Sequence, residues 1–402
     1  MTATDPRNAS PISPDGPPLR VLRAITWMGH GGIERRIVAV LPRLRDYNIE
    51  AELVCLRERG PLADDVEAAE VPLHVLGFKR RWDLGALARL TRLITAGGFQ
   101  LVHAHMYRAY LPATVAAWRA GVPIIGQVHN VDTWTSWRQR WMDRALCGRR
   151  AAMLAVSERV ADDVRHHLRL PRQRVQVLYN GIDLPAFRPT DAAERRASVR
   201  AALGIDAGAG VAVCPARLHP QKNHAGLLKA WADALQQITQ PTGSTAESWH
   251  LLLAGDGPAR PEVEALIAKA QSEGMRANCV HVLGHRDDMV DLYQASDVMV
   301  MPSFKEGFSN AVIEAMAAGL PVIATDVGGN AEAIEEGVSG MILPPGDTPA
   351  LTRALCEMMT NAQRRQAMAR GAWNRAEHFS IDEMIRQTAI IYRSIASSHP
   401  RR

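Results

Sequence analysis

Two glutamates, Glu306 and Glu314, lie eight positions apart in the segment FKEGFSNAVIEAMAAG (304–319). The Ser-Asn pair at 309–310 is typical of a helix N-cap, so the first glutamate precedes a helix and the second lies inside it. The free N–H groups of a first helical turn attract anions. A carboxylate, an anion site and a second carboxylate suit a ligand with hydroxyls at both ends and a phosphate between them, such as a nucleotide sugar. Glu314 could instead be an ordinary helix residue, but a carboxylate among Ala, Val, Ile and Met is costly without a partner.

A second group of candidate residues lies in PARLHPQKNHAGLLKA (215–230), where Arg217 follows a predicted strand and Lys222 precedes a predicted helix. Two cations at the carboxyl end of a strand can bind a diphosphate, because Arg forks onto oxygens and Lys acts as a point charge. They could also stabilise the charge on a departing nucleoside diphosphate. An isolated pair with this spacing is more often solvated surface.

Two glycine-containing turns follow predicted strands. Gly31 and Gly32 lie in WMGHGGIERR (27–36), where a ligand can approach the backbone closely, and Gly255 lies in LLLAGDGP (251–258). For Gly255 a plain turn is an equal interpretation. The first stretch is not the GxGxxG pattern of dinucleotide-binding folds.

Three histidines mark the ends of predicted strands in the first half of the chain, namely His103, His105 and His129. A lone histidine is more often structural, and this is our interpretation of His103. His129 is the stronger candidate for function, since it is the last strand residue before a long loop.

The elements that position these residues alternate along the chain from Leu19 onward. Short apolar segments followed by longer amphipathic ones predict a parallel sheet covered by helices on both faces. A linker at 180–190 separates two such series, and 347–397 is predicted to be helical. The predicted strands are 19–26, 51–56, 73–76, 101–105, 123–129, 152–157 and 175–180, then 210–216, 249–255, 279–284, 297–303, 321–325 and 339–344. The pattern therefore predicts two doubly wound α/β domains facing a cleft, where substrates bind.

The composition is that of a soluble globular protein of 402 residues, with 47% hydrophobic and 22% charged residues. The net charge of +5 fits an acidic substrate or an anionic membrane better than nucleic acid, for which no motif is present. Five single cysteines without CxxC indicate a reduced, cytosolic compartment. We expect residues 1–18 to be a disordered tail, 236–249 to be a surface loop, and no segment to span a membrane.

These stretches together resemble the retaining GT-B glycosyltransferases of family 4, also called glycosyltransferase group 1. The resemblance covers about residues 19–395 and is most specific in the E-x7-E motif from Glu306 to Glu314. The supporting stretches are RLHPQKN (217–223), AGDGP (254–258), VLGHRDDM (282–289) and YNGID (179–183). Each is weak alone, but five in this order and spacing are strong.

The resemblance implies a role for each matching residue around the donor sugar. Glu306 would bind sugar hydroxyls close to the reacting centre, and Glu314 would bind the ribose. The backbone of Phe308, Ser309 and Asn310 would hold sugar and phosphate.

It also implies how the rest of the donor is bound. Arg217 and Lys222 would hold the diphosphate, and Gly31 and Gly32 would pack near the phosphates from the other domain. His129 would lie near the donor sugar and the acceptor. The base would lie by Gly284, His285 and Arg286, with Gly255 nearby. Glu306, His129, Arg217 and Lys222 form the expected catalytic set.

The resemblance further implies a metal-independent reaction that retains anomeric configuration, and the chain has no D-x-D triplet to carry a divalent ion. No cofactor is expected beyond the nucleotide sugar, for which UDP ranks before GDP. The implied domains are a tail at 1–18, an acceptor domain at 19–185, a donor domain at 186–376 and a helix at 377–402 that crosses back to the first domain.

The acceptor side is predicted from a Trp- and Arg-rich segment at 130–150, with a second basic-aromatic stretch at 79–83. This segment could dip into an anionic membrane interface, or it could be a core-facing helix with a solvated Arg face. The first interpretation predicts an enzyme peripheral to the inner face of the plasma membrane that acts on a lipid-linked sugar. The residues concerned are Trp134, Trp137, Arg138, Arg140 and Trp141.

Three other functions remain open at this stage. A non-hydrolysing sugar-nucleotide epimerase would use the same fold without an acceptor. A non-catalytic nucleotide-sugar-binding protein would not need the intact set of Glu306, Arg217 and Lys222. A dehydrogenase ranks last, because no dinucleotide fingerprint follows the first strand.

Overall fold

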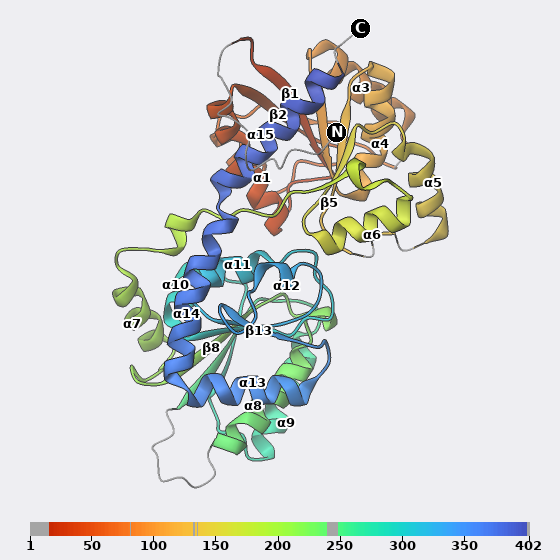
Figure 1. The fold of residues 1–402 in the computed structure, drawn as a ribbon. Coiled ribbons are helices and arrows are strands. Elements are labelled where there is room, and N and C mark those ends of the chain that lie inside the picture. Colours follow the sequence, from red (N-terminus) through yellow and green to blue (C-terminus); the bar gives the residue numbers. More distant parts are fainter. Residues whose placement is uncertain (1–15, 81, 132, 135, 239–247, 400–402) are drawn as a thin grey trace. The chain divides into compact units, whose positions relative to one another are not determined.

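The first sheet contains seven parallel strands among the described residues, in the order β3-β2-β1-β4-β5-β6-β7 (Figure 1). Each corresponds to a predicted strand with ends shifted by at most three residues, because short apolar runs between turn residues suit buried parallel strands. The strands are β1 (Leu19–Ile25), β2 (Ile49–Cys55), β3 (Leu73–Val75), β4 (Leu101–His105), β5 (Ile124–Val128), β6 (Ala152–Ala155) and β7 (Val175–Val177).

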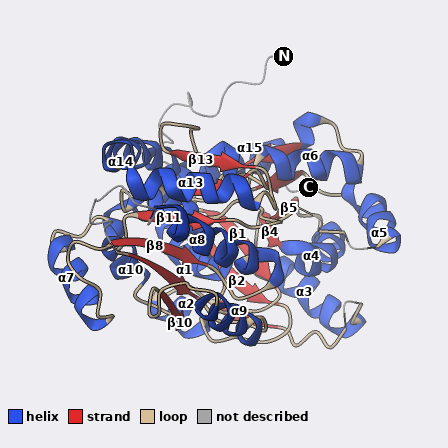
Figure 2. Cartoon of the chain, turned by 90° about the horizontal axis from the view of Figure 1, so that it is seen from below, coloured by secondary structure: helices blue, strands red, loops and turns tan. Residues whose placement is uncertain are grey.

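Helices connect these strands, as Figure 2 shows with helices in blue and strands in red. The helices α3 to α6 pack in series, while α15, the last helix of the chain, contacts α1, η2 and β4. The helical elements here are α1 (Gly32–Arg43), η2 (Leu44–Tyr47), α2 (Ala63–Ala68), α3 (Leu84–Ala96), α4 (Met106–Ala120), α5 (Trp137–Cys147), α6 (Glu158–Leu168), η3 (Arg172–Arg174) and α15 (Ile381–Ser398).

The second sheet has six parallel strands among the described residues, in the order β10-β9-β8-β11-β12-β13. The order reverses between β8 and β11, and in open α/β sheets ligands bind outside the carboxyl ends of the strands at such a switch point. The strands are β8 (Gly210–Pro215), β9 (Trp249–Ala254), β10 (Val280–Gly284), β11 (Val298–Met301), β12 (Val322–Thr325) and β13 (Gly340–Leu343).

The helices around the second sheet pack in neighbouring pairs: α8 with α9 and α13, α7 with α10, and α11 with α14. The stretch 347–397 is helical as predicted, with breaks at Asn361 and Ser380. The helical elements are η4 (Leu184–Phe187), α7 (Ala192–Ala202), η5 (Pro220–Lys222), α8 (His224–Ile238), α9 (Arg260–Ser272), α10 (Met289–Ala295), α11 (Asn310–Ala317), α12 (Asn330–Ala333), α13 (Thr348–Thr360), α14 (Ala362–Ala376) and η6 (Glu377–Phe379).

The computed structural model describes residues 16–80, 82–131, 133–134, 136–238 and 248–399. The chain divides into a first unit, made of residues up to Gly181 together with Ile381 onward, and a second unit, Ile182–Ser380. The sequence placed the corresponding boundaries at 185/186 and 376/377. Most of the expected tail and loop, residues 1–15 and 239–247, lies outside the described residues, as do residues 81, 132 and 135 of the two Trp/Arg-rich stretches.

Apolar side chains from both ends of the chain build the core of the first unit. Ile385, Tyr392 and Ile395 of α15 pack into the same buried cluster as Val21 and Ile25 of β1. Burial of one such side chain contributes about 1.5–3 kcal/mol. All five cysteines are free thiols, and four of them are buried. Within the described ranges, every helix is too short or too polar to cross a lipid bilayer.

Candidate functional site

Lys222 and Glu306 form an ion pair at the switch point of the second sheet. Lys222 follows β8 and Glu306 follows β11, and the Lys222 Nζ lies 2.6 Å from the Glu306 Oε1. The Ser303 hydroxyl donates to the same oxygen at 2.7 Å. The other carboxylate oxygen, Oε2, accepts no hydrogen bond from any described residue. Glu306 is only 8% exposed, so this charged group is fixed in place with one oxygen free for a ligand.

Backbone contacts hold the loop that carries Glu306. Phe304 donates its N–H to the Gln221 carbonyl at 2.8 Å, and the Thr325 hydroxyl donates to the Ser303 carbonyl at 2.6 Å. Gly328 lies against the Glu306 carbonyl with φ +54°, and a Cβ there would be 2.3 Å from that oxygen. Only glycine fits without strain, so the turn before α12 closes tightly over this loop.

The helix that follows begins at the predicted Ser-Asn pair, and of these two residues Ser309 is the N-cap of α11. The Ser309 side chain makes no capping hydrogen bond, although N-cap serines commonly do. The ring of Phe308 is buried against Phe379, with ring centroids 5.3 Å apart. Phe308 therefore anchors the loop through its side chain and has only its backbone to offer a ligand. The next residue, Asn310, is the first helical residue and is half-buried.

Glu314, the second glutamate of the motif, has a buried partner. The Tyr293 hydroxyl of α10 donates to the Glu314 Oε2 at 3.0 Å, and Tyr293 is fully buried. Burial and the nearby Glu314 carboxylate raise the pKa of Tyr293 well above its usual value, so the phenol stays protonated and remains a donor. The carboxylate is thus held by a neutral donor and is half-exposed.

Arg217 is exposed after β8 and forms no hydrogen bond or ion pair with a described residue. A glycine turn passes directly beside it. A Cβ at Gly255 would lie 2.2 Å from the Ala216 carbonyl oxygen, and the Gly255 N–H donates to the Gly284 carbonyl at 2.8 Å. The structure therefore brings together the ends of β8, β9 and β10, with the Arg217 guanidinium open to solvent.

The residues predicted beside the base are paired with carboxylates of their own loop. Arg286 donates to both oxygens of Asp288, at 2.7 and 2.5 Å, and His285 is exposed and lies 3.5 Å from Asp287. The Arg286 hydrogen bonds lower the pKa of Asp288. This pairing occupies the Arg286 side chain, while the backbone at Gly284 and His285 remains the part expected to hold a base.

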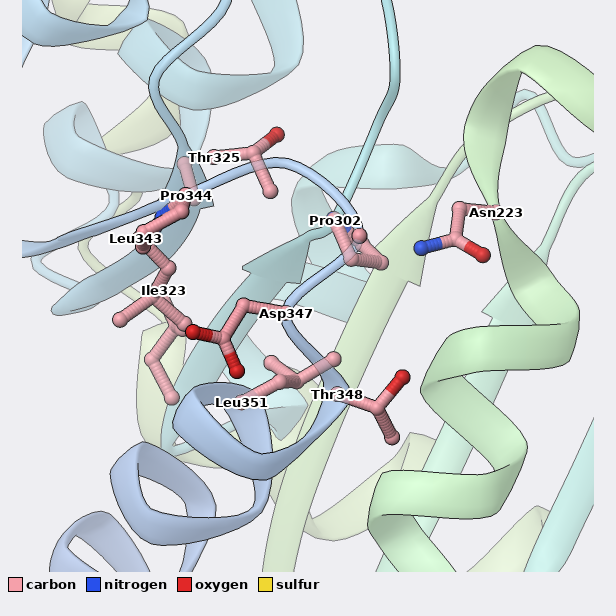
Figure 3. A pocket seen from close by; sticks show the side chains of 11 residues that line it. Asn223, Pro302, Ile323, Thr325, Leu343, Pro344, Asp347, Thr348 and Leu351 are labelled. Atoms are coloured by element: carbon pink, nitrogen blue, oxygen red, sulfur yellow. The ribbon is translucent and has the colours of Figure 1, made fainter.

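A small hollow lies beside this site, and Figure 3 shows the side chains around it. Asn223 and Pro302 line one part, and Asp347 and Thr348 at the start of α13 line another. Its volume of about 10 Å³ is at the lower limit for a single water molecule. It is too small for a sugar.

In the first unit, Gly31 is the N-cap of α1 and Gly32 is its first residue. The Glu34 carboxylate lies directly on Gly31, since a Cβ at Gly31 would be 2.3 Å from the Glu34 Oε2. Both glycines are exposed, as a close ligand approach requires, and Glu34 is buried in the first turn of the helix.

The three histidines form one stack with two arginines. Arg23 donates to the His105 Nε2 through Nε at 3.1 Å, and the His105 Nδ1 lies 3.2 Å from the His129 Nε2. Arg36 lies 3.2 Å from the His129 Nδ1. The His103 Nδ1 contacts the Tyr392 hydroxyl at 2.5 Å. His103, expected to be structural, is fully buried and connects the stack to α15.

Burial and positive neighbours keep these imidazoles neutral. The pKa of His129 lies well below its usual value because of burial, then Arg36 and Arg23. Burial is also the largest cause that lowers the pKa of His103 and His105, followed by Arg23 for His103 and by His103 for His105. Burial and Arg23 also lower the pKa of Arg36, to about 9. A neutral His129 can exchange a hydrogen bond with a hydroxyl but carries no charge near neutral pH.

The Trp/Arg segment divides into a buried and an exposed part. Trp134, expected on the acceptor or membrane side, is 4% exposed, and its indole donates to the Asp143 Oδ2 at 2.7 Å. Asp143 also pairs with the buried Arg150 at 2.6 Å, so Trp134 belongs to the interior of the first unit. Trp137 and Trp141 are 66% and 68% exposed, one helical turn apart on α5.

Arg138 and Arg140 lie between these two tryptophans on α5. The Arg138 guanidinium lies 5.5 Å from the centre of the Trp137 ring, and Arg140 is half-buried. The exposed part of the predicted surface therefore consists of two tryptophans with at least one exposed arginine.

Four residues that contact the predicted ones, two in each unit, escaped the sequence interpretation. Ser303 and Tyr293 bind the two motif glutamates, and Arg23 and Arg36 hold the histidine stack. The pattern P-S-x-x-E could have indicated Ser303, since it precedes Glu306 by three residues. Nothing local indicated the others, because their contacts depend on the order of strands and helices in space.

The second unit thus offers a fixed carboxylate with one free oxygen, a lysine beside it, an unpaired arginine and a helix N-terminus. A carboxylate accepts hydrogen bonds from hydroxyls, and the cations with the helix N–H groups favour a diphosphate. Across the described residues, no three or more His, Cys, Asp or Glu side chains are arranged to hold a metal ion.

Comparisons with known proteins match both units. A family model described as Glycosyl transferases group 1 matches residues 209–361, and one described as Glycosyltransferase Family 4 matches residues 30–185. D-inositol 3-phosphate glycosyltransferase of Streptomyces bingchenggensis is 30% identical over 393 residues, covering 90% of this chain and 84% of the relative. The protein of the same name from Rhodococcus jostii is 30% identical over 379 residues, covering 90% and 80%.

Solved structures share the fold. HepE of Anabaena, solved in complex with UDP, has a TM-score of 0.80 at 22% identity, covering 94% of this chain and 100% of that chain. WaaG, a glycosyltransferase involved in lipopolysaccharide biosynthesis, has a TM-score of 0.67 at 17% identity, covering 92% and 99%. At these identities the likeness shows the fold, which is the GT-B arrangement of two parallel-sheet α/β domains.

Proposed function

This chain belongs to the glycosyltransferases of group 1 and family 4, and on that premise we propose that it transfers a hexosyl unit from a nucleoside diphosphate sugar with retention of anomeric configuration. The proposed acceptor is a saccharide or a lipid-linked saccharide, in the synthesis of a cell-surface polysaccharide or glycolipid. The observation that carries this proposal is the Lys222–Glu306–Ser303 group at the switch point of the second sheet.

UDP is the proposed nucleotide, ahead of GDP. The structural neighbour HepE was solved with UDP and also with UDP-glucose, which supports this choice. In this chain the Glu314 carboxylate, positioned by Tyr293, would accept hydrogen bonds from two ribose hydroxyls. The backbone near Gly284 would hold the base.

In the proposed reaction, the bond between the anomeric carbon and the diphosphate oxygen breaks while the acceptor oxygen bonds to the same face of the sugar. The acceptor hydroxyl gives its proton to the departing phosphate oxygen. Glu306 orients the hexose through its free Oε2, and Lys222, Arg217 and the first turn of α11 stabilise the charge on the leaving diphosphate. A neutral His129 would contribute a hydrogen bond from the first unit.

The proposed reaction needs no metal ion. Lys222 and Arg217 would supply the positive charge that a divalent ion provides to a diphosphate elsewhere. Turnover is therefore expected to be the same with EDTA as with Mg²⁺.

We further propose a peripheral contact with an anionic membrane on the cytoplasmic side. Trp137 and Trp141 are exposed on one face of α5 beside Arg138, and this combination of residues favours the interface of anionic lipids. In a flotation assay with phosphatidylglycerol vesicles, the Trp137→Ser/Trp141→Ser variant is expected to lose most binding, while Trp118→Ser on α4 serves as the exposed control. Equal flotation of the wild-type protein, the double variant and the Trp118→Ser control would refute the contact with the membrane.

The first test is a thermal-shift panel of UDP, GDP and ADP, each with EDTA and with Mg²⁺. A ligand at 100 times its dissociation constant stabilises the native state by about 2.7 kcal/mol. We expect UDP to raise the melting temperature equally in both conditions. Transfer assays with UDP-sugars would then include D-inositol 3-phosphate, for which the relatives are named. Conversion of the donor sugar without any acceptor would favour an epimerase, and no shift with any nucleotide would contradict the proposal.

A further inference from the structure

The histidine stack of the first unit has hydrogen-bond contacts that cannot all be satisfied at once. A guanidinium only donates, while a neutral imidazole has one N–H donor and one lone pair that accepts. Arg23 lies at one end of the pair His105 and His129, and Arg36 lies at the other. Burial keeps both imidazoles neutral by lowering their pKa values. In such a chain two donors must face each other in one of the three contacts.

The strength of the contacts decides which of the three this is. Arg23 directs both its Nε and its Nη2 at the His105 Nε2, at 3.1 and 2.9 Å, and is only 6% exposed. Arg36 reaches the His129 Nδ1 with one nitrogen at 3.2 Å and is half-buried. Two charge-assisted hydrogen bonds from a buried guanidinium outweigh one from a guanidinium that is freer to move. The His105 Nε2 is therefore an acceptor.

The tautomer of His129 follows from this assignment. Because the neutral His105 accepts at Nε2, its proton lies on Nδ1. The His105 Nδ1 lies 3.2 Å from the His129 Nε2 and donates to it. The His129 Nε2 is then an acceptor, and the single proton of this neutral ring lies on Nδ1.

Two donors consequently meet at the open end of the stack. The His129 Nδ1–H faces the Arg36 Nη2 at 3.2 Å, and the Arg36 Nη1 has no hydrogen-bond partner among the described residues. Two N–H groups that converge in this way suit an oxygen with lone pairs, which accepts from both. A sugar hydroxyl or a phosphate offers such an oxygen.

We propose that Arg23 and His105 are positioning residues that hold His129 in its Nδ1–H tautomer, so that His129 donates a hydrogen bond to an oxygen of the bound substrate. In this tautomer the lone pair of His129 is already used by His105, so His129 does not take a proton from the acceptor hydroxyl. That proton goes to the departing phosphate oxygen, as in the proposed reaction. The proposal rests on the proposed function, because the substrate is that of the glycosyl transfer.

The tautomer can be measured without any substrate. In the full-length protein with ¹⁵N-labelled histidine, a long-range ¹H–¹⁵N correlation spectrum distinguishes a protonated ring nitrogen from an unprotonated one. A second sample with His129→Gln identifies the signals of His129. We expect the wild-type His129 to carry its proton on Nδ1. A proton on Nε2 would overturn the proposal, and this result does not depend on the folding of a positioning variant.

Two arginine variants have opposite expected effects on this spectrum. Arg23→Met removes the donors that fix His105, so Arg36 can donate to the His129 Nδ1 and the His129 proton moves to Nε2. Arg36→Met removes the opposing donor, and the proton stays on Nδ1. Arg23→Lys keeps a cation that only donates, and the proton is expected to stay on Nδ1 there too. A proton that remains on Nδ1 in Arg23→Met would overturn the role of Arg23.

Turnover at saturating donor and acceptor is the second readout. One hydrogen bond from a neutral donor that acts in the transition state is lost, so Arg23→Met should lower kcat about three- to tenfold with KM nearly unchanged. Arg23→Lys should restore most of the turnover. Arg20→Met is the matched control, because Arg20 lies on the same strand, β1, and pairs with Glu52 away from the stack.

The outcomes separate this proposal from the proposed function. A proton that moves to Nε2 in Arg23→Met together with a fall in kcat supports the proposal. A proton that moves while kcat equals that of Arg20→Met would overturn the hydrogen bond to the substrate. If the wild-type chain transfers no sugar, the proposed function fails, and the spectra still decide whether Arg23 and His105 fix the tautomer of His129.

Discussion

Replacement of Glu306 by glutamine tests the donor site most directly, because it removes a charge and keeps the shape of the side chain. At 2.6 Å the Lys222 Nζ and the Glu306 Oε1 attract each other by about 6 kcal/mol in an effective dielectric constant of about 20. Most of that attraction is offset by the cost of taking both charges out of water. The amide oxygen of glutamine still accepts from Ser303, so we expect a loss of about 1 kcal/mol of stability, or about 2–4 °C in melting temperature.

The effect on turnover should be larger. The free Oε2 of Glu306 is proposed to bind a sugar hydroxyl, and a hydrogen bond to a charged acceptor contributes about 1.5–3 kcal/mol. If it acts in the transition state, Glu306→Gln lowers kcat by about 10- to 150-fold. Ser303→Ala removes one donor to the other oxygen and is expected to lower kcat by about fivefold, about 1 kcal/mol.

The assay is release of UDP from the UDP-sugar that the wild-type chain turns over fastest, with saturating donor and acceptor. Glu262→Gln, an exposed carboxylate on α9, is the matched control. Turnover of Glu306→Gln within threefold of this control would refute the assignment of the donor site to this carboxylate.

Three further substitutions test other contacts. Tyr293→Phe removes the hydroxyl that donates to Glu314, and we expect UDP to bind about fivefold more weakly in calorimetry while pyrophosphate binds as before; equal losses for both would contradict a role at the ribose. Gly328→Ala places a Cβ 2.3 Å from the Glu306 carbonyl oxygen at φ +54°, and we expect it to lower the free energy of unfolding in urea by about 1–3 kcal/mol. An unchanged free energy of unfolding would contradict the tight packing of this turn. His224 is buried, and burial followed by the Lys222 charge lowers its pKa to about 4. The unfolded chain therefore takes up the proton first, and stability is lost as pH falls from about 6.5 towards 4. His224 should account for about 2 kcal/mol of lost stability between pH 7 and pH 5, and His224→Leu should remove that part of the pH dependence in urea titrations; an unchanged slope would show that this histidine is not the source.

The strands and most helices could be predicted because they depend on local patterns. An apolar run such as PVIAT (321–325) between Gly319 and Gly328 fits few structures besides a buried strand. The N-cap at Ser309 was equally visible. Its missing side-chain hydrogen bond was not, because the local sequence does not fix how the chain approaches α11.

The contacts of the site depended on information that a linear pattern does not contain. Ser303 could have been paired with Glu306 from their spacing, but Tyr293 meets Glu314 only because the fold places the hydroxyl from α10 against the carboxylate from α11. For Trp134 the local pattern indicated the surface, and the structure places it in the interior. A tryptophan among arginines favoured a surface role, but the buried Asp143 gave its indole a partner inside.

The last helix, α15, has a consequence for the order in which the protein is made. The chain leaves the first unit at Gly181 and returns only at Ile381, and Ile182 and Ser380 form a bridge where it departs and returns. Tyr392 then fills the first unit's core and bonds to His103. On the ribosome, the second unit has its whole sequence before the first one does. The first unit therefore cannot complete its core until the residues from Ile381 onward have been synthesised.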